Sequence, residues 1–252
     1  MFFDTHAHYD DKAFDPDREE LLNQIHSTSV DYIVNPGCTV ESTRIASELA
    51  ETHDFMYFAA GVHPEEVAEW NTNTLEVLAE FTGDKKCVAI GEIGLDYYWD
   101  KSNADEQKRV FRLQLELACD CNLPVIIHDR EAHNDSLEMT KSFRKVHGVF
   151  HCFSSSAEMA QELLKHGWYL GFDGPVTYKN ARKTVEVLQA CPLDRIIIET
   201  DSPYMSPVPV RGTRNNSANL EYICSAIAQI KGISFESAAE ITKRNGETLF
   251  NI

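Results

Sequence analysis

Apolar runs and amphipathic stretches alternate along the whole chain. Eight runs have the length and composition of β-strands, and they lie near 2–6, 31–36, 56–62, 87–92, 124–128, 148–152, 168–172 and 195–200. Their apolar residues are nearly continuous, which is typical of parallel strands covered on both faces. Apolar positions at helical spacing predict helices near 17–28, 41–52, 73–82, 105–121, 135–145, 156–166, 180–190, 217–231 and 235–244.

This alternation predicts an α/β fold, and more specifically a single (β/α)8 TIM barrel over residues 1–252. A barrel of this kind typically has about 250 residues. A doubly wound open sheet is the structural rival, but no G-x-G-x-x-G follows the first strand, so a dinucleotide fold lacks its usual marker. The longest expected loops, 93–104 and 201–216, follow strands, on the face where barrel active sites form.

Composition narrows the class of protein. The net charge of −17 argues against a general nucleic-acid binder, although bound divalent cations can invert the local charge at a site that cleaves a phosphodiester. Seven scattered cysteines without a C-x-x-C pair are expected to be free thiols of a reducing cytoplasm. No apolar run approaches the roughly 18 residues of a membrane span, and the first strand already carries Asp4, so neither a membrane segment nor a signal peptide is expected.

Residues of the types that bind metals gather at the ends of the predicted strands. They are His6, His8, Glu92, His128, His151 and Asp201. Residues two apart on a strand point to the same side, so His6 and His8 can reach one ion. Alone, such a pair is more often a packed or surface pair, but four further ligand types at later strand ends favour a metal site. Imidazoles and carboxylates at one end of a sheet are what two hydrolytic divalent ions, Mg, Mn or Zn, need.

Several of these residues have candidate catalytic roles. Glu92 has two oxygens that can bridge two cations, and the glycines beside it permit close backbone approach. Asp201 can bind a metal and accept a proton from the attacking water. Glu199 lies on the same side but deeper, where it is expected to orient a ligand. His63 ends the third strand, and coordination, acid–base catalysis, substrate binding and a structural role all stay open for it.

Arginines near the expected mouth are candidates for binding phosphate, because a guanidinium forks onto phosphate oxygens. Arg130 follows the fifth strand, and prolines in the preceding loop are expected to hold Arg211 in place. Arg214 is a third basic residue of the same region. Any one of them is by default a surface arginine.

With these residues in view, the chain resembles the TatD family of metal-dependent deoxyribonucleases, which belong to the amidohydrolase-like TIM barrels. The resemblance runs essentially from end to end. It rests on Asp4-Thr5-His6-Ala7-His8, Gly61-Val62-His63-Pro64, Gly91-Glu92-Ile93-Gly94-Leu95-Asp96-Tyr97, His128-Asp129-Arg130, His151-Cys152-Phe153-Ser154, Glu199-Thr200-Asp201-Ser202-Pro203-Tyr204 and Arg211-Gly212. The chain departs from the family pattern at Glu65, at Ser155 and at Asn215-Asn216-Ser217, and none of these departures removes a candidate metal ligand.

The resemblance implies how the metal ligands divide. One ion would be held by His6, His8, Glu92 and Asp201, and the second by Glu92, His128 and His151, with Glu92 as the bridge. It also implies a cytoplasmic enzyme that hydrolyses DNA phosphodiesters. We expect an exonuclease that acts on single strands or 3′ ends through metal-activated water, with Asp201, Glu92 and His63 as catalytic residues and Arg130 and Arg211 as substrate contacts. No obligate protein partner is evident.

Two other classes of function stay in view. A related barrel could hydrolyse small amides, lactones or phosphoesters, but many such enzymes bridge their metals with a modified lysine at the end of the fourth strand, where this chain has Glu92. A metal-binding protein without catalytic activity is the third class, and the full set of candidate ligands argues against it.

Overall fold

The computed structural model describes residues 1–252, in which eight strands alternate with helices. The strands are β1 (Phe2–Asp4), β2 (Val30–Pro36), β3 (Met56–Ala60), β4 (Cys87–Asp96), β5 (Val125–Arg130), β6 (Gly148–Phe150), β7 (Tyr169–Phe172) and β8 (Ile196–Ile198). The helices are α1 (Arg18–Thr28), α2 (Val40–Thr52), α3 (Thr74–Phe81), α4 (Ala104–Cys121), α5 (His133–Ser142), α6 (Ala157–Lys165), α7 (Arg182–Ala190), α8 (Leu220–Lys231) and α9 (Phe235–Phe250). Each predicted strand and helix is therefore present.

The strands form one sheet in the order β1 to β8. The first and last strands also meet, since the Thr5 N–H donates to the Ile198 carbonyl over 3.3 Å and Ala7 forms a parallel bridge with Ser202. Sequential parallel strands that close on themselves and alternate with helices are a (β/α)8 barrel. The predicted fold class is confirmed.

The chain divides into two compact units, Met1–Asn35 with Cys152–Ile252, and Pro36–His151. We call them the terminal unit and the central unit. The single domain over 1–252 stays a prediction.

None of the helices combines the length and apolar character needed to cross a membrane.

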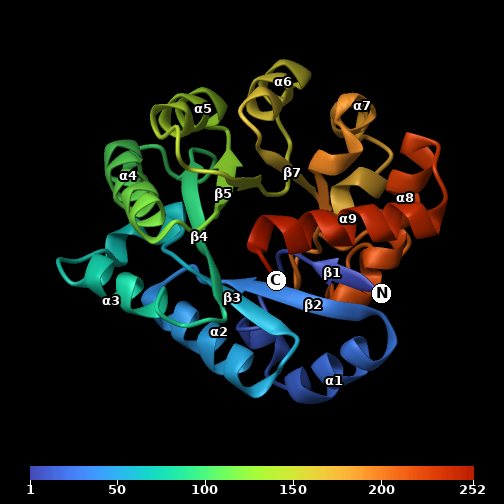
Figure 1. Cartoon of the computed structure of the whole chain (residues 1–252), viewed down its shortest axis with the longest axis horizontal. Coiled ribbons are helices and arrows are strands. Elements are labelled where there is room, and N and C mark those ends of the chain that lie inside the picture. Colours follow the sequence, from blue (N-terminus) through green and yellow to red (C-terminus); the bar gives the residue numbers. More distant parts are fainter. The chain divides into compact units, whose positions relative to one another are not determined.

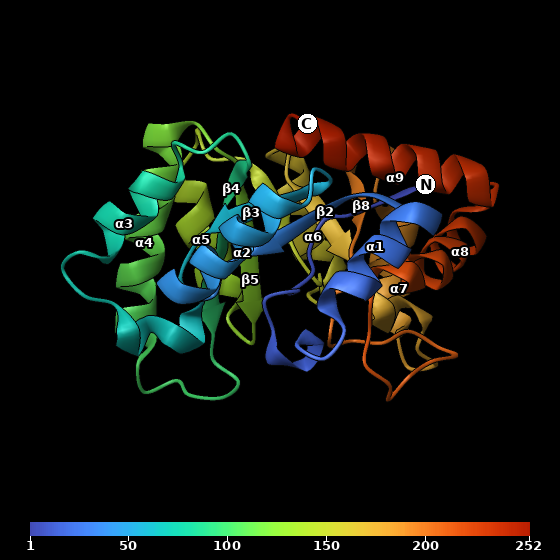
Figure 2. The same ribbon diagram turned by 90° about the horizontal axis from the view of Figure 1, so that it is seen from below.

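In the terminal unit, β1 pairs with β2 and β7 pairs with β8, both in parallel. Ile196, Ile197 and Ile198 are fully buried. Neighbouring residues of a strand point to opposite faces, so three buried isoleucines in a row require that both faces of β8 be covered. Helix α9 packs against β1 and β8 and lies beside α8 (Figures 1 and 2).

Helix α9 continues six residues beyond the predicted end at 244, through Asn245-Gly246, a dipeptide that usually ends helices. A Cβ at Gly246 would lie 2.8 Å from Phe3, so this glycine allows the helix to approach β1 closely. Asn245 is buried, and its side-chain amide donates to the carbonyls of Leu193 and Ile196. Gly246 and Asn245 therefore make contacts between α9 and its neighbours, and neither residue ends the helix.

In the central unit, β3 to β6 pair in parallel, with α4 packed beside β4 (Figure 1). Strand β4 runs to Asp96, whereas the sequence predicted an end at 92 and a loop from 93. The extension is possible because Gly94 adopts a φ of 145°, and a Cβ there would overlap the carbonyl oxygen of His128. The register shifts between Ile90 and Ile93, and β4 then stays paired with β5 as far as Asp96 and Arg130.

Candidate metal centre

The terminal unit brings three predicted ligands together: His6, His8 and Asp201. The Nε2 atoms of His6 and His8 are 3.0 Å apart. Each also approaches Oδ1 of Asp201, at 3.6 Å from His6 and 3.5 Å from His8. Both imidazoles are buried. We call this set the terminal cluster. The side chains of His6 and His8 point to the same side, as predicted for residues two apart on a strand.

The backbone around Asp201 is fixed by its neighbours. The Asp201 N–H donates to the His6 carbonyl over 2.9 Å, and the residue has a φ of 54°, a left-handed conformation. Buried Asp4 accepts the N–H and the hydroxyl of Thr200, at 3.0 and 2.6 Å. Asn215, fully buried, donates its side-chain amide to the carbonyls of Thr200 and Tyr204. The segment that carries Asp201 is therefore held from two sides.

Burial raises the pKa of Asp4 to about 6, against the lowering effect of its hydrogen bonds from Ser217, Thr200 and His6. No sequence pattern indicated a role for Asp4 or Asn215 at this site. Asn215 belongs to a segment that departs from the family pattern, yet its side chain anchors the loop next to the terminal cluster.

The central unit brings together Glu92, His128, His151 and His63, which we call the central cluster. Oε1 of Glu92 lies 2.8 Å from Nδ1 of His128, 2.7 Å from Nε2 of His151 and 3.6 Å from Nε2 of His63. Glu92 is 2% exposed and the three histidines are largely buried. One carboxylate oxygen therefore faces three imidazole nitrogens.

Asp96 holds the ring of His128 from the other side. Its Oδ2 lies 3.0 Å from Nε2 of His128. Burial opposes the charge on His128, but the hydrogen bonds to Asp96 and Glu92 outweigh it and raise the pKa of His128 to about 10. Burial likewise disfavours the Asp96 carboxylate, and its hydrogen bonds to His128 and to backbone N–H groups nevertheless keep its pKa below the usual value. Sequence analysis assigned no role to Asp96.

The ring orientation of His63 follows from a backbone contact. The Glu65 N–H donates to Nδ1 of His63 over 3.2 Å, at the start of a 3-10 helix, η2 (Pro64–Glu69). Since Nδ1 accepts a hydrogen bond, a neutral His63 carries its proton on Nε2, the atom that faces Glu92. That arrangement suits a hydrogen-bond donor to substrate, and substrate binding is one of the roles left open by the sequence.

The three arginines have different surroundings. Arg130 is exposed, and its guanidinium lies 3.9 Å from the ring centroid of Tyr98. Arg214 makes two hydrogen bonds to the Asp17 carboxylate, at 2.7 and 2.6 Å, so it ties the loop to the start of α1. Arg211 lies 4.3 Å from the ring centroid of Tyr178.

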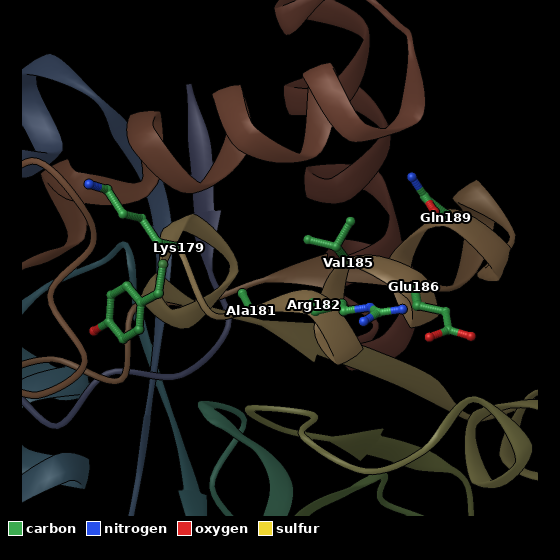
Figure 3. A pocket seen from close by; sticks show the side chains of 7 residues that line it. Lys179, Ala181, Arg182, Val185, Glu186 and Gln189 are labelled. Carbon is green, nitrogen blue, oxygen red and sulfur yellow. The ribbon is translucent and has the colours of Figure 1, made fainter.

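Tyr178 lines a hollow of about 430 Å³ in the terminal unit. Figure 3 shows Arg182 and Glu186 from α7 on its wall, with Lys179 from the segment before the helix. Arg211 therefore contacts a tyrosine that borders a hollow lined by two cations, Lys179 and Arg182, and one carboxylate, Glu186.

Two further carboxylates, Glu199 and Asp173, are buried in the terminal unit, and the sequence pointed only to Glu199. Glu199 is fully buried and accepts the Cys152 N–H, in agreement with a supporting role. Burial and the charge of nearby Asp173 raise its pKa well above the usual value. Burial and the charge of Asp201 also raise the pKa of Asp173 to about 8. Asp173 follows β7, and the sequence analysis did not single it out.

The side chains of the two clusters fit a divalent metal. Imidazole suits zinc and other transition metals, and carboxylate oxygens suit Mg and Mn as well. Within the central unit, the ligand atoms of His63, Glu92 and His128 lie close enough to contact one ion. A carboxylate that orients a coordinating histidine through its other nitrogen is the usual arrangement around such sites, and Asp96 stands in that relation to His128.

A (β/α)8 barrel with clusters of imidazoles and carboxylates after its strands belongs to the class of metal-dependent hydrolases. The model of the family described as TatD related DNase matches residues 3–251. The chain therefore belongs to the TatD related DNase family.

Relatives and solved structures agree with this assignment. The chain is 44% identical to the uncharacterized metal-dependent hydrolase YabD of Bacillus subtilis, over all of both chains. It is 32% identical to the 3′-5′ ssDNA/RNA exonuclease TatD of Escherichia coli K12, over 99% of each. The crystal structure of YJJV, a TatD homolog from Escherichia coli K12, superposes with a TM-score of 0.94 at 30% identity, covering 100% of this chain and 98% of that one.

Proposed function

We propose that this chain is a metal-dependent exonuclease that removes nucleotides from the 3′ end of single-stranded DNA. The observation that carries the proposal is the central cluster, in which one oxygen of Glu92 faces three imidazole nitrogens. The relative named as a 3′-5′ exonuclease supports the choice of substrate and polarity.

We propose that two divalent ions, Mg, Mn or Zn, are held by His6, His8 and Asp201 in the terminal cluster and by Glu92, His128 and His151 in the central cluster. When bound, such ions lower the pKa of water and polarise phosphoryl oxygens.

We propose a proton-transfer role for Asp201 and a hydrogen-bonding role for His63. The carboxylate of Asp201 is 17% exposed and faces His6 and His8 through Oδ1, and it would accept a proton from the attacking water. His63, which in its neutral form holds a proton on Nε2, would donate a hydrogen bond from that atom to the leaving oxygen. Each role assigns one atom of one residue, so each can be tested by a single substitution.

Arg130 and Arg211 are proposed to neutralise the phosphates of the strand. Both are exposed and neither is bound to a carboxylate, unlike Arg214. We also infer a cytoplasmic location, which is supported by seven cysteines that are all free thiols.

The test is a cleavage assay with metal-stripped protein to which Mg, Mn or Zn is added back. Single- and double-stranded DNA labelled at the 5′ end would be offered to the wild type and to Glu92→Gln, which keeps the side-chain size and loses the charge. A ladder of shortening single strands, absent from Glu92→Gln, is expected. Turnover of lactones, amides or small phosphoesters without any cleavage of nucleic acid would instead favour the second class of hydrolase.

A further inference from the structure

An exposed aromatic pair follows strand β4. Tyr98 is 54% exposed and Trp99 is 66% exposed. Their rings meet edge to face, with centroids 4.8 Å apart and an interplanar angle of 84°. Neither ring contributes to the core, and large exposed aromatic side chains often mark a binding surface.

The guanidinium of Arg130 joins this pair. It lies 3.9 Å from the ring centroid of Tyr98 and 5.4 Å from that of Trp99. Arg130 ends β5 and is paired in register with Asp96, the last residue of β4. The Tyr97 N–H also donates to the Arg130 carbonyl over 2.9 Å. Two aromatic rings and a cation therefore lie together at the ends of the adjacent strands β4 and β5.

The segment that carries the aromatic pair is held by hydrogen bonds that also connect it to the central cluster. Oδ1 of Asp96 accepts the N–H of Tyr98 at 2.8 Å and that of Trp99 at 3.4 Å, while its Oδ2 contacts His128. The buried side chain of Gln107 donates to the Asp96 carbonyl at 2.8 Å and accepts the Asp96 N–H at 2.9 Å. One carboxylate thus links the aromatic pair to a residue of the central cluster.

We propose that Tyr98, Trp99 and Arg130 form a platform on which one base of a single-stranded nucleic acid stacks, with Arg130 contacting the adjoining phosphate. The proposal rests on the proposed function and specifies how that site recognises its substrate. Every base has a π-face that can stack on an aromatic ring without regard to sequence. In a duplex those faces are covered by neighbouring base pairs, so the platform favours single strands.

Charge at the platform agrees with this occupant. Arg130 is exposed, and the Lys101 ammonium lies 5.0 Å from the ring centroid of Tyr97, the residue before the pair. The carboxylate of Glu65 lies near Arg130 and Asp100 directly follows Trp99, so the two cations offset nearby acidic groups. A single-stranded nucleic acid has bases that can stack on the aromatic rings and phosphates that can bind the neighbouring cations.

The test measures binding in the presence of a chelator, so that it does not depend on cleavage. A fluorescently labelled single strand would be compared with a strand of equal length that lacks bases. Trp99→Ala is expected to weaken binding of the normal strand about 10-fold, in line with about 1–3 kcal/mol per stacked base. It should leave binding of the base-free strand unchanged. Trp99→Phe, which keeps a ring, should retain most of the affinity. Trp70→Phe, at a half-buried tryptophan directly after η2, is the control for the loss of an indole.

The outcomes separate the platform from the proposed function. Equal affinities of wild type and Trp99→Ala for the normal strand, or an equal loss for both strands, would overturn the platform. If the wild type also cleaved single strands with metal present, the proposed function would still stand. Base-dependent binding that is lost in Trp99→Ala, with no cleavage of any nucleic acid, would support the platform and overturn the nuclease proposal.

Discussion

Oδ2 of Asp96 lies 3.0 Å from Nε2 of His128, and Nδ1 of the same ring lies 2.8 Å from Oε1 of Glu92. His128 is therefore fixed between two carboxylates. A proton on Nε2 that is shared with Asp96 leaves Nδ1 as the atom that can bind a metal. Because Asp96 and Glu92 both hold this ring, the affinity for a metal should depend on the Asp96 carboxylate and on the protonation of His128.

Asp96→Asn should weaken metal binding about 10- to 100-fold, the usual cost of losing a carboxylate that orients a histidine ligand. The asparagine amide can donate to Nε2, which would place the ring proton on Nδ1 and block it as a ligand. Because the variant keeps a side-chain oxygen for the N–H of Tyr98, the fold should be retained. Competition with a coloured chelator measures the affinity, and an unchanged affinity would exclude the orienting role.

Metal binding should release a proton from His128. Its pKa is raised to about 10 in the metal-free protein, so the ring is charged at neutral pH and must become neutral to bind a metal. Apparent affinity should therefore rise as the pH increases towards the pKa of His128. Calorimetry of metal binding in two buffers of different ionisation enthalpy counts the protons. Identical heats in both buffers would contradict the prediction.

Gly94→Ala should destabilise the protein by about 2–4 kcal/mol, because the new methyl group would overlap the His128 carbonyl at a φ of 145°. Urea unfolding of the metal-free protein measures the loss. Gly83→Ala is the matched control, since the nearest atom to its added Cβ would be 3.3 Å away and its φ needs no glycine. A loss at Gly94 no larger than at Gly83 would show that β4 relaxes easily at this point.

Arg211→Ala and Arg214→Ala should differ in their effects on the nuclease. Arg211 is proposed to contact phosphate, so its loss should raise the KM for single-stranded DNA about 5- to 10-fold and reduce the salt dependence of binding. Arg214 is bound to Asp17, so its replacement should change KM less than about 2-fold. Initial rates at low and high salt measure both effects. The opposite ranking would reassign the phosphate contact to Arg214.

The sequence predicted the fold well because each strand of this barrel is covered on both faces and reads as an apolar run. It also predicted which residues gather within each unit, since His6 and His8, or His128 and His151, directly follow such runs. These signals are local, and alternation along a strand is enough to interpret them.

Asp96 could not be predicted in the same way. It lies four residues after Glu92, in a segment expected to be a loop, and the shifted register before Ile93 and the φ of Gly94 interrupt the alternation that would assign its side. Asn215 was hidden for a different reason. Its role is to donate to the carbonyls of Thr200 and Tyr204, 15 and 11 residues earlier, and no spacing along the chain encodes those contacts.

The central claim is that both clusters hold metal ions that are needed to cleave a phosphodiester. The most direct test is to titrate metal-stripped protein with Mn while measuring bound metal by equilibrium dialysis and cleavage of a 5′-labelled single strand in the same samples. The account predicts two ions bound per chain, with cleavage appearing as the second is bound and absent from Glu92→Gln. Full cleavage by the metal-stripped protein, or two bound ions without any cleavage of DNA, would contradict it.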